Sequence, residues 1–448
     1  MKWQRFIILT FLLASVFPHC LFAQKAWSLD QCINYALDNN FSIQRQELGV
    51  NIQKSDFRQA GYELLPSISA ESSLNQYFGR SIDPTTNNYV NVQFLSNGYG
   101  IYSSIDLFNG FVKLNTLNMQ KHNLMAEKSK LQQVRNQVAF NVMNGYFNVL
   151  LKQGLYDIVK ANFQLSREQM RSSRKFVEVG RKPGTDLLES EAVVAADSFL
   201  LVQANHMLEQ ACLDLKYQMN FPVANPLEID SILLSVYTGQ PDTLTAQNLF
   251  QLASEALPEL KIADNQVNAA KKAVNISQGA FSPRVGFYSG WNTQYMETNR
   301  DENDKIIPFS DQVSNNASSY LSLGIEIPLF SKFSKHTLLS KSKMQYQQSR
   351  LQYDDVKYKL MMEVEKSLME WRSARTEYES SIKQQAKSFN AFQAAEKKLQ
   401  NGLIGIIEFY IQKNNWKNAE TEVLRTGLQL LLKERYLRFM MTGSLASN

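Results

Sequence analysis

Apolar residues recur at every seventh position along two long stretches without proline, 111–178 and 333–400. In the first stretch the series comprises Leu117, Leu124, Leu131 and Val138 and, after a step of four residues, Val142, Val149, Tyr156, Phe163, Met170 and Val177. Adding 222 to each number gives the second series, in which only Gln385 is neither apolar nor aromatic. A heptad pattern predicts coiled-coil helices, and the four-residue step predicts a local unwinding of the supercoil. We therefore expect two long helices, each spanning roughly 100 Å.

A similar offset relates other parts of the chain and indicates an internal two-fold repeat. Gly180 and Gly402 end the two long stretches 222 residues apart, and Pro66 and Pro283 are 217 apart. The first half is predicted as a helix over 28–62, strands over 64–78 and 99–109, and helices over 111–178 and 186–220. The second half is predicted as 246–280, 284–296, 319–330, 333–400 and 407–441 in the same order. The repeats cover 24–221 and 246–448, joined by a linker over 222–245, with no separately folding domains.

The predicted strands alternate between apolar and polar positions. In the last strand Leu321, Leu323 and Ile325 share one face, while the intervening residues are small or polar. This period of two fits a half-buried strand, and the strand lengths also suit a tilted membrane strand. Four strands cannot close a barrel, so a lipid-facing sheet would have to pair with other copies, and three copies would supply 12 strands. The alternative is a soluble four-stranded sheet that covers a core.

The N-terminus has the pattern of a secretory signal over residues 1–23. Lys2 and Arg5 precede an apolar run over 6–17, and a small residue, Ala23, ends the segment. Lipidation at Cys20 is the less favoured interpretation, because His19 stands where a lipidation motif has a small residue. We expect the mature chain to begin near Gln24, outside the inner membrane.

Composition and candidate chemistry favour neither an enzyme nor a nucleic-acid binder. The 47 basic and 42 acidic residues leave a net charge of only +5, which is too small to indicate a nucleic-acid partner. Of the four histidines, His19 lies in the predicted signal and the others have no cysteine or histidine at ligand spacing, so we expect no metal site and no cofactor. Cys32 and Cys212 lie on different predicted helices, and both buried thiols and a disulfide are compatible with that placement.

Several paired segments, in their order and duplication, resemble the outer-membrane efflux (TolC-like) protein family. They are Ala36-Leu37-Asp38-Asn39-Asn40 with Ala256-Leu257-Pro258-Glu259-Leu260, Leu65-Pro66-Ser67 with Ser282-Pro283-Arg284, Leu107-Phe108-Asn109-Gly110-Phe111 with Pro328-Leu329-Phe330, and Val179-Gly180 through Asp186-Leu187-Leu188 with Gly402 through Glu408. The resemblance covers essentially the whole mature chain. It implies a mainly α fold with a small β part. In that fold, long antiparallel α-hairpins form a barrel continuous with a trimeric 12-stranded transmembrane β-barrel.

The same resemblance implies a passive export duct in the outer membrane, with its helical tunnel in the periplasm. The implied partners are two other copies of the chain, outer-membrane lipid, a periplasmic adaptor and an inner-membrane transporter of an efflux pump or a type I secretion system. The alternative function is a periplasmic or surface coiled-coil structural or adhesion protein.

The helix tips are the candidate functional site. An acid follows each tip glycine by six residues, Asp186 after Gly180 and Glu408 after Gly402. Each acid either stabilises the start of a return helix, where Thr185 could also cap, or lines a closed periplasmic entrance. The resemblance implies the second role for Glu408.

The tips also depart from the usual family pattern. Ile411 stands where a second acid is expected, which favours a more apolar gate that includes Ile407. Arg181 and Lys182 follow the first tip glycine, either as adaptor contacts or as a solvated face.

Overall fold

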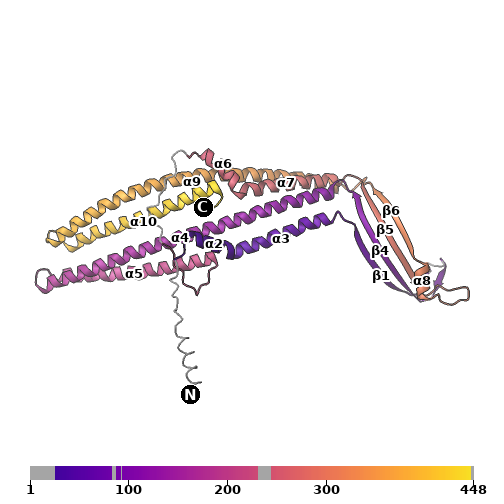
Figure 1. Cartoon of the computed structure of the whole chain (residues 1–448), viewed down its shortest axis with the longest axis horizontal. Coiled ribbons are helices and arrows are strands. Elements are labelled where there is room, and N and C mark those ends of the chain that lie inside the picture. Colours follow the sequence, from indigo (N-terminus) through magenta and orange to yellow (C-terminus); the bar gives the residue numbers. More distant parts are fainter. Residues whose placement is uncertain (1–25, 83–86, 92, 231–243, 445–448) are drawn as a thin grey trace, which may run out of the picture. The chain divides into compact units, whose positions relative to one another are not determined.

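A computed structural model describes residues 26–82, 87–91, 93–230 and 244–444 (Figure 1). The predicted signal over 1–23 and part of the predicted linker lie outside these residues. The chain divides into two compact units. The first comprises Met1–Gln44, Arg135–Ala256 and Glu363–Asn448, and the second comprises Arg45–Val134 and Leu257–Met362. In the part of the chain described here, no helix combines the length and the apolar content that crossing a bilayer requires.

The two long heptad stretches form uninterrupted helices of 67 residues, α4 (Val112–Glu178) and α9 (Ser334–Gln400). Each is followed by a return helix, α5 (Gly184–Met219) or α10 (Ile406–Thr442). All twenty positions of the two heptad series are buried or half-buried. The predicted helices are therefore confirmed to within two residues at each end, and the heptad pattern marks their packing seams.

The shorter helices differ from the prediction. The segments 28–62 and 246–280 were each expected to be one helix, but each contains a break. The observed helices are α2 (Leu29–Asn39), α3 (Phe41–Tyr62), α6 (Ala246–Ala256) and α7 (Pro258–Gly279).

Each break coincides with a residue in an extended conformation. Asn40 has an extended backbone, and its side-chain oxygen accepts a 2.8 Å hydrogen bond from the backbone N–H of Ser42, as a helix cap does. Leu257 is extended because it precedes Pro258, whose ring disfavours the helical conformation in the preceding residue.

The second unit contains an antiparallel four-stranded sheet with the order β1-β4-β5-β6 (Figure 1). Its strands are β1 (Ser67–Tyr77), β4 (Phe94–Phe108), β5 (Arg284–Met296) and β6 (Ser318–Glu326). The strand predicted over 319–330 ends earlier, at Glu326, because Pro328 has no N–H for a ladder. The loops expected over 79–98 and 297–318 contain a small hairpin, β2 (Arg80–Ile82) with β3 (Tyr89–Asn91), and a short helix, α8 (Phe309–Asn315).

One face of the sheet carries glycines that are covered by tyrosine rings. A Cβ atom at each of three glycines would lie 2.5–2.6 Å from the nearest atom of a tyrosine ring or hydroxyl: Gly100 under Tyr102, Gly286 under Tyr288 and Gly290 under Tyr320. The strand register places these six residues on the same face as Ser104 and Ser322. Aromatic rings fill the space that strand glycines leave open, so this polar face is lined in part by rings that lie against the backbone.

Candidate functional site

The two hairpin tips, both in the first unit, turn by the same backbone motif. Gly180 and Gly402 each have φ +70°, in the left-handed region that glycine adopts without steric cost. The next residues, Arg181 and Leu403, donate backbone hydrogen bonds of 2.8 and 2.9 Å to the carbonyls five residues before them. This six-to-one bond is characteristic of a Schellman cap. The prediction that the two long helices end at Gly180 and Gly402 is therefore confirmed.

Alanine at either tip glycine is expected to lower stability by roughly 1 kcal/mol, because an L residue in the left-handed region is strained. No atom of the described residues lies within 4 Å of a Cβ atom added at Gly180 or Gly402, so the cost comes from the backbone alone. Thermal unfolding in detergent measures it. Gly184 is the matched control: it also faces open space but begins α5 without a positive φ. A loss in the Gly184→Ala variant equal to that at the tips would contradict the explanation.

The acid of the first tip is paired within its own turn. The Asp186 carboxylate lies 3.3 Å from the Lys182 ammonium, and that ammonium also lies 6.0 Å from the centre of the Phe176 ring. Thr185 is inside α5, whose cap residue is Pro183, so Thr185 does not cap this helix. Arg181 is exposed. The charge of Asp186 is thus compensated locally, and its position in the first turn also suits the helix dipole.

The second tip separates two opposite faces of α10. Ile407, Glu408 and Ile411 are exposed, with 61% and 52% exposure for the two isoleucines. Ile406 and Phe409 are buried on the other face, with 2% and 1% exposure. The structure therefore groups the three predicted gate residues of this tip on one exposed surface that combines a carboxylate with two apolar side chains.

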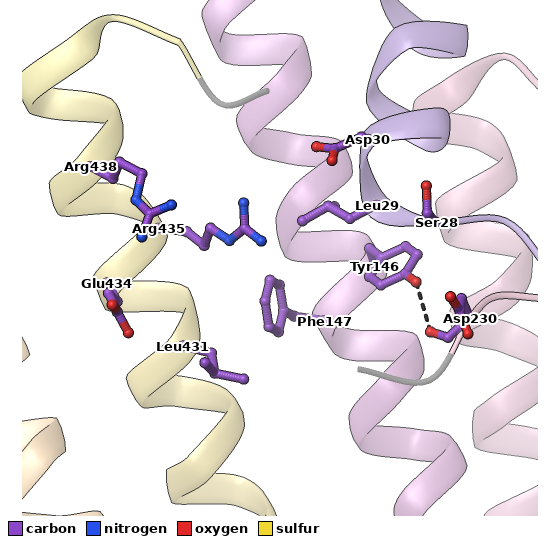
Figure 2. A pocket seen from close by; sticks show the side chains of 10 residues that line it. All are labelled: Ser28, Leu29, Asp30, Tyr146, Phe147, Asp230, Leu431, Glu434, Arg435 and Arg438. Atoms are coloured by element: carbon purple, nitrogen blue, oxygen red, sulfur yellow. Dashed lines mark hydrogen bonds between the residues drawn. The ribbon is translucent and has the colours of Figure 1, made fainter. Parts of the chain in front are cut away.

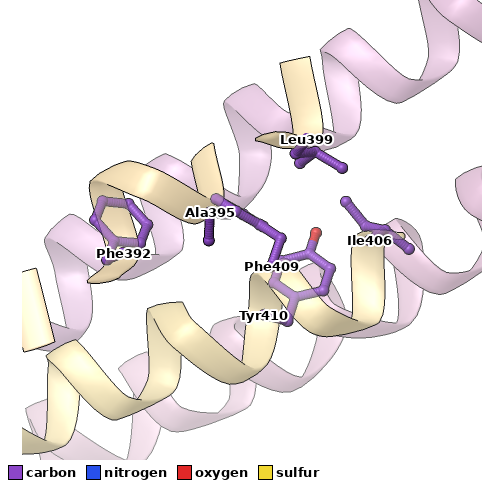
Figure 3. Packing of buried hydrophobic residues seen from close by; sticks show 6 residues of the cluster. All are labelled: Phe392, Ala395, Leu399, Ile406, Phe409 and Tyr410. Carbon is purple, nitrogen blue, oxygen red and sulfur yellow. The ribbon is translucent and has the colours of Figure 1, made fainter. Parts of the chain in front are cut away.

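An aromatic cluster holds the buried face of this tip in place. Its core comprises Phe392, Ala395 and Leu399 of α9 and Ile406, Phe409 and Tyr410 of α10 (Figure 3). The ring of Phe392 stacks on that of Trp416 with centroids 4.8 Å apart. Leu165 of α4 and Val193 of α5 pack against the cluster, so it joins the second hairpin to the first. Phe392 and Leu399 were predicted to pack from their heptad positions, whereas the cluster residues of α10 were not predicted.

A buried lysine close to this cluster was also missed. Lys413 of α10 is 2% exposed and forms an ion pair of 3.1 Å with Asp197 of α5. Neither residue belongs to a recognisable motif. The available signal was a lysine four residues after Phe409, which places it on the same face of the helix as the cluster.

A pocket of about 330 Å³ lies at the other end of the first unit, where α2, α4 and α10 come together (Figure 2). It is lined by Ser28, Leu29, Asp30, Tyr146, Phe147, Asp230, Leu431, Glu434, Arg435 and Arg438. Glu434 is 6% exposed, and its Oε1 atom has no hydrogen-bond partner among the described residues. Burial raises the pKa of Glu434, and the charges of Arg438 and Arg435 oppose that shift.

The Glu434→Gln variant is expected to gain thermal stability at neutral pH and none near pH 4.5. Because the folded pKa lies above the ordinary value of 4.5, the folded chain holds the proton more tightly than the unfolded chain. The stability contributed by the protonated acid is present below pH 4.5 and is lost as the pH rises through the folded pKa. Melting curves across this range provide the measurement, with Glu365→Gln on the exposed surface of α9 as the control. An equal shift at all pH values would argue against a buried acid.

Neither a disulfide nor a metal centre appears among the described residues. Cys32 and Cys212 are both free thiols, which decides between the two interpretations left open by the sequence. Burial raises the pKa of Cys32 to about 12, so this thiol is not reactive at neutral pH. Within the same ranges, no group of three or more histidine, cysteine or acidic side chains is arranged to hold a metal ion.

Comparisons with known proteins agree with the fold. The chain is 22% identical to the outer membrane efflux protein BepC of Brucella suis biovar 1 over 76% of this chain and 69% of that protein. It is 21% identical to the probable efflux pump outer membrane protein TtgC of Pseudomonas putida over 92% and 84% of the two chains. The crystal structure of the channel-forming protein CusC superposes with a TM-score of 0.80 at 17% identity, covering 94% of this chain and 92% of CusC. The family model described as "Outer membrane efflux protein" matches residues 32–219 and 249–443, and the chain therefore belongs to this family.

Proposed function

We propose that the chain forms a homotrimeric export duct in the outer membrane, gated at the periplasmic helix tips. Family membership supports an outer-membrane channel rather than an enzyme. The trimer is supported by exposed sheet edges and apolar surfaces that have no partner among the described residues of one copy.

The sheet has two open edges and an exposed apolar face. Among the described residues, strands β1 and β6 each pair with only one neighbour in this sheet. On β6, Leu321, Leu323 and Ile325 are 77%, 63% and 65% exposed. In a bilayer every backbone polar group needs a partner, so open edges require strands from other copies. Three copies would pair β1 with β6 around a ring of 12 strands, an even number that is typical of outer-membrane barrels.

Two helices carry exposed apolar stripes. On α5 the stripe consists of Leu188, Phe199, Val202, Leu213 and Tyr217, and on α9 of Met344, Leu351, Tyr358, Met362 and Met369. The spacing on α9 is seven, seven, four and seven residues, which repeats the four-residue step of the buried seam. An exposed apolar stripe on a helix indicates a surface that packs against another helix. A second copy of the chain is the partner that the open sheet edges also demand.

The gate in this proposal is the exposed face of α10 at the second tip. Three symmetry-related copies of Glu408 would bring like charges together at the entrance and favour cations, while Ile407 and Ile411 narrow it. Asp186 contributes less to selectivity, because Lys182 lies 3.3 Å from it. The tip surface around Gly180, Arg181, Lys182 and Gly402 is the proposed contact for a periplasmic adaptor. The adaptor in turn connects the duct to an inner-membrane transporter of an efflux or type I secretion system.

The Glu408→Ala variant is expected to raise single-channel conductance and to lower the preference for cations in planar bilayers. The reason is the loss of three carboxylates from the narrowest part of the path. Asp186→Ala is the matched comparison, since it also removes a first-turn acid of a return helix but one that is already paired. Conductance and selectivity that are the same in the parent and in Glu408→Ala would remove Glu408 from the gate.

A further inference from the structure

The ammonium group of Lys413 is buried, and a buried charge needs polar partners. It lies in the second turn of α10 and is 2% exposed. Lysine is almost never fully buried without a partner, because removing an ammonium from water is costly. Burial lowers the pKa of Lys413, and Asp197 opposes that shift; Lys417, one turn further along α10, adds to the lowering.

The surroundings of Lys413 satisfy its ammonium completely. Its three donors match three acceptors: the Asn162 carbonyl at 3.1 Å, Asp197 Oδ2 at 3.1 Å and the Ser166 hydroxyl. The Ser166 hydroxyl in turn donates to Asp197. Asn162 and Ser166 belong to α4, and Asp197 belongs to α5. One side chain of the second hairpin is therefore held by both helices of the first hairpin.

A buried ion pair of this kind defines position more than it adds stability. The attraction between the two charges is offset by their loss of hydration, so apolar residues of similar volume often stabilise a protein as well or better. An apolar contact, however, tolerates sliding and rotation, whereas three directed hydrogen bonds are satisfied in one register only. The aromatic cluster around Phe409 packs the two hairpins together through apolar contacts, whereas Lys413 joins them through directed hydrogen bonds.

Lys413 is close enough to the tip to set the direction of its exposed face. Glu408 and Ile411 precede it by five and two residues in the same uninterrupted helix. Because an α-helix is rigid over such a distance, a rotation of α10 that moves Glu408 also moves Lys413 away from its acceptors.

We propose that Lys413 is a positioning residue of the periplasmic gate. By binding Asp197, Ser166 and the Asn162 carbonyl, it holds α10 against α4 and α5 and thereby fixes Ile407, Glu408 and Ile411 in the resting position. This inference rests on the proposed gate at the second tip and adds the group that sets its geometry.

The test compares conductance with stability in three full-length variants. Lys413→Met leaves Asp197 buried without its partner, and we expect a conductance roughly threefold above the parent together with a lower melting temperature. The double variant Lys413→Met, Asp197→Leu removes both charges. We expect its melting temperature to return to that of the parent, because the two apolar side chains pack together. Its conductance should stay raised, because no directed hydrogen bond fixes the position of α10. Lys417→Met is the control on the same helix, with conductance equal to that of the parent.

Other outcomes distinguish an error in the role of Lys413 from an error in the proposed function. If the double variant recovers both melting temperature and conductance, Lys413 has only a structural role and the inference is overturned. The inference also fails if the parent conducts and Lys413→Met conducts equally. A parent that conducts no ions at all would instead contradict the proposed function. Should Lys413→Met not fold, Ser166→Ala keeps the ion pair and removes one acceptor, and a smaller rise in conductance is expected; an unchanged value would overturn the inference.

Discussion

Replacing Leu323 of β6 by arginine is expected to abolish assembly of the chain in the outer membrane. Leu323 is 63% exposed on the apolar face of the sheet, which meets lipid in the proposed duct. Arginine on the lipid face of a membrane strand costs about 2–4 kcal/mol at the middle of the bilayer, and a trimer would incur this cost three times. The measurement is the amount of heat-sensitive trimer extracted by detergent from outer-membrane fractions.

The neighbouring residue provides a sharp control. Ser322 precedes Leu323 in the same strand and pairs with Tyr288 on the opposite, polar face. Because side chains alternate between faces, Ser322→Arg points into the water-filled side of the proposed barrel and should leave assembly largely intact. Equal assembly of the two variants would contradict the assignment of the apolar face to lipid. Equal loss would show that the strand tolerates no arginine on either face.

The Gly110→Ala variant is expected to lose roughly 3 kcal/mol or more of stability, enough to reduce the yield of folded protein severely. Gly110 joins β4 to α4 with φ +66°. A Cβ atom there would lie 2.2 Å from the backbone carbonyl oxygen of Gly279, the last residue of α7, and 2.7 Å from Ser282 Cβ. The two backbones cannot move apart without displacing the junction of helix and sheet. The overlap caused by the added methyl group therefore cannot be relieved by a small local shift.

The reciprocal variant and a distant glycine complete this test. A Cβ atom at Gly279 would lie 2.3 Å from the Gly110 carbonyl oxygen, so Gly279→Ala should show a comparable loss. Gly61 of α3 is the control, since the nearest atom of the described residues would lie 3.9 Å from its added Cβ atom. Thermal unfolding and folded yield are compared for the three variants. Wild-type stability in Gly110→Ala would mean that the close approach of the two backbones does not contribute to the fold.

The parts of the fold that depend on periodic patterns could be predicted from the sequence. The heptads located α4 and α9 because a continuous seam of packed residues leaves its period in the chain. The alternation of residues 284–296 located β5 with its observed bounds.

Features set by a single contact were not predictable in this way. The break at Asn40 depends on a side-chain cap and on a 3.0 Å bond to the Gln218 carbonyl, which is 178 residues away in sequence. The hairpin β2–β3 and helix α8 are too short to show a period. At the tips, the glycines were predictable from helix capping, but the pairing of Lys413 with Asp197 joins residues 216 apart and has no local signature.

Assembly of this chain into a conducting trimer can be measured on the protein purified in detergent. The protein is sized by light scattering and then reconstituted into planar bilayers for single-channel recording. We expect particles of three chains that conduct ions with a preference for cations. Monomers that stay in solution without detergent and leave the bilayer non-conducting would contradict it.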